Sequence, residues 1–196
     1  MRRVLVCGVV SALIAAVAAA DTPPLKIVLA SGSPIEQRKK AQIERLAAAY
    51  DLKKFTLTKE IRIEQGAVPH SMPVLTLNGA FPANDDRALS QYVHEQGHWL
   101  LDRHRYDLRE LFRTLTDAFP GIPTRPPQGA DGAQDSYFHL AVITLEWEAL
   151  DELIGTERAK AVMTFKQTDH YTALYALVLE KRDRIEGIIR RYGIRW

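Results

Sequence analysis

The chain has 196 residues, a formal net charge of +2 and a single cysteine. This length suits one domain with a hydrophobic core and leaves little room for two. A nearly balanced charge gives no reason to expect nucleic acid or an acidic membrane surface as a partner.

The first twenty residues are typical of a secretory signal peptide. Arg2 and Arg3 precede an apolar stretch that ends in small residues, and a polar, proline-containing segment follows at 21–24. We therefore expect cleavage near Ala20 and a periplasmic or secreted protein without stable membrane insertion. The rival interpretation is a retained membrane anchor, because the apolar stretch is close to the shortest length that spans a bilayer.

Cleavage would change both the charge and the redox chemistry of the chain. It removes two arginines and no acidic residue, so the formal charge falls from +2 to zero. It also removes Cys7, the only cysteine, so an exported protein would have no internal disulfide. We expect residues 21–196 to form a single domain that depends on its core and, in one interpretation, on a metal.

The first part of this domain predicts a helix followed by a small sheet. Ser33, Pro34 and Glu36 form a capping pattern ahead of a helix that runs to about Tyr50. Alternation of apolar and polar residues predicts two or three strands, at 55–58, 61–63 and 73–77. We expect a small, mostly antiparallel sheet.

The rest of the chain predicts helices. Asn84 and the two aspartates after it indicate the start of a helix that runs to about His104. A long surface loop rich in proline and glycine is expected at 120–132. Further helices are predicted at about 107–119, at 136–154 with Gly155 as its cap, from 156, and at about 169–191. The expected fold class is therefore α+β, a small, mostly antiparallel sheet followed by a helical half.

The segment His94-Glu95-Gln96-Gly97-His98 carries the chemistry. Histidines four residues apart on a helix lie on one face, so both imidazoles can reach one ion. Zinc binds imidazole nitrogen and, in catalytic sites, keeps one position for water. Glu95 follows the first histidine and is placed to act on that water as a general base. The competing interpretation is a solvated helical face that matches the pattern by accident.

The segment resembles the HExxH motif of the zincin metallopeptidases. The resemblance implies that His94 and His98 bind Zn²⁺, that Glu95 is the catalytic base, and that a strand of the preceding sheet, here 73–77, pairs with a peptide or protein substrate. It is specific only at the motif, and the remaining similarity is one of layout.

Two candidates for a third ligand follow the motif directly. His104 has the spacing of the metzincins, but that family has a glycine where this chain has Leu101, and a continuing helix would rotate His104 off the ligand face. Asp102 shares the face of His98 but lies about 12 Å from His94 along the axis, at about 1.5 Å per residue.

The third ligand that we expect is Glu146, within the apolar helix at 136–154. A carboxylate in such a run is costly to bury without a partner. A glutamate ligand from a later helix is the gluzincin arrangement, which the sequence resembles here. Glu148 is the nearest rival, but His139 and Glu146 are seven residues apart and share a face that Glu148 does not.

A hydrolase of this type also needs a donor for the oxygen that becomes negative. The resemblance to gluzincins implies a tyrosine or histidine from the C-terminal part, and we select His139 and Tyr171 as catalytic residues beside Glu95. His170 and Tyr175 are further candidates, although helical spacing is also compatible with core packing of both tyrosines. His70 is interpreted as an ordinary loop histidine.

The function expected from the sequence is thus that of an exported zinc metallopeptidase. The first alternative is a non-catalytic metal-binding or partner-binding envelope protein that retains a zincin-like fold. The second is a helical structural protein in which the HExxH match is accidental.

Overall fold

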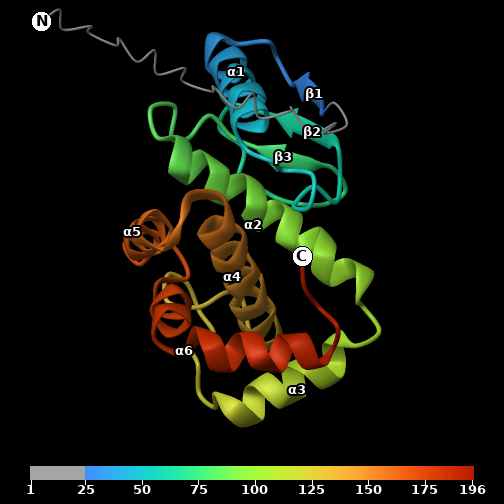
Figure 1. The fold of residues 1–196 in the computed structure, drawn as a ribbon, viewed down its shortest axis with the longest axis vertical. Helices are drawn as coiled ribbons and strands as arrows, with labels where there is room; N and C mark the ends of the chain where they lie inside the picture. Colours follow the sequence, from blue (N-terminus) through green and yellow to red (C-terminus); the bar gives the residue numbers. More distant parts are fainter. Residues whose placement is uncertain (1–24) are drawn as a thin grey trace, which may run out of the picture.

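The computed structural model describes residues 25–196, so the predicted signal peptide at 1–20 and Cys7 lie outside the described residues. Within them, a small sheet with one helix lies at one end of the molecule and five more helices form the rest (Figure 1). The elements are β1 (Lys26–Leu29), α1 (Pro34–Ala49), β2 (Glu60–Ile63), β3 (Leu75–Leu77), α2 (Asp85–Arg103), α3 (Leu108–Ala118), α4 (Ala133–Ile154), α5 (Thr156–Lys166) and α6 (Thr172–Arg191).

The sheet is parallel, so the prediction of a mostly antiparallel sheet is wrong. Its order is β1-β2-β3, and both neighbouring pairs run in the same direction. The antiparallel pairing found among residues 25–196 is an isolated bridge between His70, in the loop after β2, and Thr76 of β3. The fold is mostly helical, with a small parallel sheet in place of the expected α+β arrangement.

The error has two causes in the sequence. The short strand β1 was not predicted, and with it the β1-α1-β2 crossover, which returns the chain to the same end of the sheet and makes the pair parallel. The predicted strand at 55–58 does not form, because a side chain, and not a neighbouring strand, forms the hydrogen bonds with its backbone. The buried Gln96 amide accepts from the backbone N–H groups of Leu57 and Thr58 and donates to the Thr58 carbonyl.

The predicted first helix is confirmed, and its capping residues also tie it to the sheet. The Ser33 hydroxyl accepts from the backbone N–H of Glu36 at 3.3 Å. The Glu36 carboxylate accepts backbone N–H groups from Ser31 and Gly32 before the helix and from Gln65 just after β2. One carboxylate therefore satisfies donors from two segments that are far apart in the sequence.

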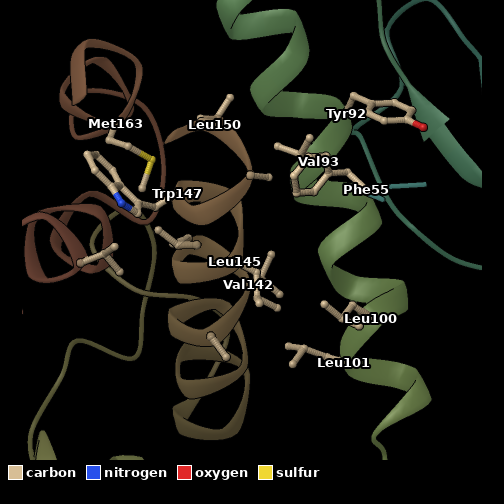
Figure 2. Packing of buried hydrophobic residues seen from close by; sticks show 14 of the residues in the cluster. Phe55, Tyr92, Val93, Leu100, Leu101, Val142, Leu145, Trp147, Leu150 and Met163 are labelled. Atoms are coloured by element: carbon tan, nitrogen blue, oxygen red, sulfur yellow. The ribbon is translucent and has the colours of Figure 1, made fainter. Parts of the chain in front are cut away.

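The helical half is organised around α4, an apolar helix that contributes buried residues to the core along most of its length. Val142 and Leu145 of α4 face Val93 and Leu101 of α2 in a closely packed interface (Figure 2). The predicted helices in this half are confirmed, and Gly155 ends α4 with a φ of 81° that favours glycine. Among residues 25–196, no helix has the length and apolar character needed to cross a membrane.

Candidate metal centre

Three histidines meet where α2 packs against α4. His94 and His98 lie one turn apart on α2, and His139 comes from the first half of α4. Ligand atoms of the three imidazoles all lie within 4.8 Å of one another. The ring centroids are 5.1 Å apart for His94 and His98, 5.1 Å for His98 and His139, and 5.9 Å for His94 and His139. Three imidazoles in this arrangement can hold one metal ion.

Two of these rings are oriented by hydrogen bonds at one nitrogen. The Nδ1 atom of His94 lies 2.8 Å from Oε2 of Glu146. The Nδ1 atom of His139 lies 3.0 Å from the backbone oxygen of Asp135 and 3.0 Å from its Oδ1. Because both partners are acceptors, each Nδ1 carries the proton and each Nε2 has a free lone pair. This is the pattern by which proteins fix the tautomer and orientation of metal-binding histidines.

Glu146, the third ligand expected from the sequence, lies beneath His94 and does not join the cluster. Its Oε2 accepts from His94 and from the Tyr175 hydroxyl at 2.9 Å, and its Oε1 accepts from the Ser90 hydroxyl at 2.5 Å. The side chain is fully buried. Glu146 and His139 share a face of α4 as expected. His139 lies beside His94 and His98, whereas Glu146 accepts a hydrogen bond from His94.

The electrostatics of Glu146 keep it ionised despite its burial. Burial raises the pKa of this carboxyl. The hydrogen bond from His94, and then the charges of His94 and Lys166, lower the pKa and together outweigh burial, so the net shift is downward. A buried carboxylate that accepts several donors is stabilised in its charged form. A charged Glu146 strengthens the hydrogen bond to His94 and makes the opposite ring nitrogen a better electron donor.

The other third-ligand candidates lie elsewhere. Glu148 lies on a different side of α4, in a separate depression with Arg190 and Trp196. His104 follows the last residue of α2, which continues past Leu101 as the absence of a glycine there predicted. Asp102 lines the same cleft as the histidines but pairs with Arg105 at 3.0 Å.

Two histidines of the cluster, His98 and His139, favour the neutral, metal-competent form of imidazole. Burial, and then the neighbouring His94 and His139, place the pKa of His98 well below its usual value. Burial and His94 likewise lower the pKa of His139 to about 4, against the opposing effect of Asp135. Uncharged imidazoles present a lone pair at neutral pH without the need to lose a proton first.

Glu95 lies next to the cluster on α2 and is positioned by the loop that follows β2. The Ser71 hydroxyl donates to Oε2 of Glu95 at 2.6 Å. The Trp99 indole N–H, one turn further along α2, donates to the backbone oxygen of Ser71 at 2.9 Å. Both Glu95 and Ser71 are buried. One oxygen of Glu95 is thus held by the protein, and the carboxylate lines the same cleft as the histidines.

Tyr171 stands against the cluster from the start of α6. Its ring centroid lies 4.2 Å from that of His139. Burial, and then the charges of Asp135 and Glu95, raise the pKa of its hydroxyl to about 12, so it remains a hydrogen-bond donor at neutral pH. Its backbone adopts a φ of 54°, a left-handed conformation that is costly for a bulky residue. Such strain is often found where a fold positions a functional side chain.

The remaining candidates have different places. Tyr175 is buried and supports Glu146, so the structure gives it both the core position and the polar contact that the sequence left open. His170 is exposed, pairs with Asp169 at 3.0 Å and lines the cleft beside Tyr171. His70 lines the rim, with Nδ1 2.9 Å from the Val68 carbonyl.

These groups open into a cleft of about 860 Å³. Its walls come from the loop after β2, the loop before α2, one face of α2, the starts of α3 and α4, and the segment from the end of α5 to the start of α6. The apolar lining includes Val68, Met72, Phe81, Leu108, Phe138 and Phe165. The expectation that 73–77 offers a free edge to a substrate is not met, because Thr76 exchanges two backbone hydrogen bonds with His70, at 2.7 and 3.1 Å.

Several contributors were not identified from the sequence. Ser71, in the loop after β2, donates to Glu95. Ser90 of α2 donates to Glu146 of α4. Asp135 accepts from His139, one turn further along α4. A serine or an aspartate near a helix has many ordinary roles, and the sequence contains no signal that separates these three. The pairing of Asp135 with His139, four residues apart on one helix, is the single contact that helical spacing could have suggested.

Comparison with known proteins adds no relative. No protein-family model, no curated protein and no solved structure matches the chain.

Proposed function

We propose that this chain is a zinc-dependent hydrolase that cleaves peptide or similar amide bonds. The observation that carries the proposal is the convergence of His94, His98 and His139 beside Glu95 in an open cleft. A purely structural role would not require three imidazoles to share one point, two of them with the outer nitrogen bound to an acceptor.

The donor set fits zinc better than the hard cations. Imidazole nitrogen suits zinc and other transition metals, whereas magnesium and calcium prefer oxygen. Catalytic zinc sites commonly have three protein ligands and leave one position for water or substrate. A zinc ion held by the three histidines would supply Lewis-acid activation of a water and of the carbonyl under attack.

The residues of the chain supply the proton transfers. With Oε2 of Glu95 bound by Ser71, Oε1 is free to take a proton from the attacking water and then to deliver it to the leaving nitrogen. The Tyr171 hydroxyl, kept protonated by its raised pKa, would donate to the oxygen on which negative charge develops. In this proposal His139 is a ligand, and Glu146 positions His94.

The site of action and the substrate class follow from the sequence expectations. We propose that the chain is exported, with cleavage near Ala20, and acts in the periplasm or outside the cell on peptides or proteins. Sequencing of the N-terminus of the exported protein tests the cleavage. An intact N-terminus on membrane-bound protein would contradict it.

The decisive experiment compares wild type with Glu95→Gln, and with Asp102→Asn as the matched control. All three proteins are loaded with zinc, assayed for metal content, and incubated with a mixed peptide library analysed by mass spectrometry. We expect stoichiometric zinc in all three, and a loss of about 10²–10⁴-fold in hydrolysis for Glu95→Gln alone, because only that variant lacks the general base.

Other results assign the chain to an alternative. Stoichiometric zinc without hydrolysis by wild type would indicate a non-catalytic metal-binding protein. A purified wild type that retains no metal would indicate that the histidine cluster is structural. Equal hydrolysis by Glu95→Gln and wild type would remove Glu95 from the mechanism.

A further inference from the structure

Lys166, the last residue of α5, is the single lysine or arginine among the residues that line the cleft. The residue is 94% buried, with 6% of its surface exposed. Among residues 25–196, its ammonium group forms a cation–π contact with the Phe81 ring, 5.5 Å from the centroid, and no hydrogen bond or ion pair. The side chain is thus mostly buried while its ammonium gains only a weak contact from the protein, which leaves the ammonium available to an anion.

The neighbouring buried lysine is satisfied in a different way. Lys39 of α1 donates to the backbone oxygen of Ala80 at 3.1 Å. Burial, and then the charge of Lys166, lower the pKa of Lys39 to about 8 against the opposing effect of Asp85. Lys166 has no such acceptor. Its charge reaches Glu146, but that carboxylate already accepts from Ser90, His94 and Tyr175. The ammonium of Lys166 is thus left for a group that enters the cleft.

The position of Lys166 along the cleft follows from its neighbours on α2. The preceding residue, Phe165, lies under the Arg87 guanidinium, 3.3 Å from the ring centroid. Lys166 also acts on Glu146, whose partners on α2 are Ser90 and His94. Lys166 therefore lies about one to two helical turns, roughly 5–11 Å, from the middle of the histidine cluster towards the start of α2.

We propose that Lys166 binds a carboxylate of the substrate, one or two residues from the bond that is cleaved. An extended peptide advances about 3.3–3.6 Å per residue, so a carboxylate at this distance from the reacting carbonyl reaches the ammonium. The group is either the free C-terminus of a peptide or an acidic side chain, since both have the same chemistry. This inference rests on the proposed function in taking the ligand to be a peptide.

The two ends of the cleft differ in a way that fits this polarity. At the Lys166 end, the lining includes the ammonium, the Phe81 ring and the carboxylate of Asp169. At the other end, beyond His98, the lining is formed by Leu108, Phe138 and the carboxylate of Asp102. Asp169 pairs with His170 and Asp102 pairs with Arg105, whereas the Lys166 ammonium forms no ion pair among residues 25–196, so a negatively charged group is attracted to the first end.

The test uses three small probes that differ in their carboxylate: N-acetyl-phenylalanine, N-acetyl-phenylalaninamide, and N-acetyl-glutamic acid α-amide. Each is titrated into metal-free protein and followed by protein-observed NMR, so that no carboxylate can bind a metal instead. We expect N-acetyl-phenylalanine or the glutamate probe to bind at least about tenfold more tightly than the uncharged amide, as a hydrogen bond to a charged group contributes. Which of the two acids binds better identifies the source of the carboxylate.

The variants assign the effect to one side chain. Lys166→Met should abolish the preference for an acid, Lys166→Arg should retain it, and Lys160→Met, an exposed lysine on the same helix, should leave it unchanged. If Lys166→Met does not fold, Lys166→Gln takes its place. Equal binding of all three probes by wild type, or a preference that survives the loss of the lysine, would overturn the proposal. Because the readout needs neither metal nor catalysis, a failure of the proposed hydrolase would leave this result intact.

Discussion

Two glutamates on α4, only two residues apart, show how differently the two sides of one helix are built. Glu146, on the cleft side, is fully buried and accepts hydrogen bonds from three side chains of two other helices: Ser90 and His94 of α2, and Tyr175 of α6. Glu148, on the opposite side, keeps 13% of its side chain exposed, and its Oε1 is buried without a hydrogen-bond partner.

The pKa values of the two carboxyls move in opposite directions. Burial, and then the nearby Glu186, raise the pKa of Glu148 to about 7, whereas the donors around Glu146 outweigh its burial and lower the pKa. Burial alone thus does not decide the charge of a carboxyl, and the number of oriented donors does. The side with donors is the side where the helix holds a histidine cluster in place.

The largest expected effect is on zinc affinity and comes from removing a histidine on the cleft side of α4. His139→Ala removes one of the three proposed ligands, and we expect zinc affinity to fall by more than about a hundredfold, beyond the usual effect of a supporting residue. Competition with a chromophoric chelator measures this affinity. The matched control is His170→Ala, an exposed histidine of the same cleft, which should bind zinc as wild type does. Equal zinc affinity in His139→Ala and wild type would exclude His139 from the ligand set.

A smaller effect on zinc affinity is expected when the two glutamates are substituted in turn. Glu146→Gln keeps the shape of the side chain but removes the charge that orients His94, and we expect zinc affinity to fall by about 10–100-fold. Glu148→Gln should change it by less than twofold, about 0.4 kcal/mol or less. The same chelator competition measures both. A fall comparable to that of His139→Ala would instead support the sequence expectation that Glu146 is itself a ligand.

The smallest expected effect concerns stability on the side away from the cleft. The folded-state pKa of Glu148, about 7, lies above its ordinary value of 4.5, so between these values the folded protein holds a proton that the unfolded chain has lost. Stability from this group is therefore present at low pH and is lost as pH rises through 7. In Glu148→Gln the decrease in unfolding free energy from pH 5 to pH 8 should shrink by about 1–3 kcal/mol.

Urea unfolding of metal-free protein at the two pH values measures this difference. The matched control is Glu157→Gln, an exposed glutamate at the start of α5 that does not act on the pKa of Glu148, and for which the same slope as wild type is expected. An unchanged slope in Glu148→Gln would show that this carboxyl is not held in its protonated form.

The helices and the HExxH face were accessible from the sequence because their signals are local. Capping residues such as Ser33 and Asn84 lie beside the groups they cap, and the spacing of His94 and His98 places both on one face whatever surrounds the helix. The sheet was less accessible. Strand direction depends on what lies between strands, and a strand as short as β1 carries too few residues for its alternation to be recognised.

For the candidate site, the amino-acid sequence alone determined a pair of histidines with a glutamate between them, and a later helix with His139 and Glu146 on one face. Only the tertiary structure decided how those two divide their roles. The packing of α2 on α4 brings His139 to the other two imidazoles, while the donors from Ser90 and Tyr175 engage Glu146 beneath His94. Residues seven apart on a helix share a direction but are separated by about 10 Å, and only the partner helix selects which one lies beside His94 and His98.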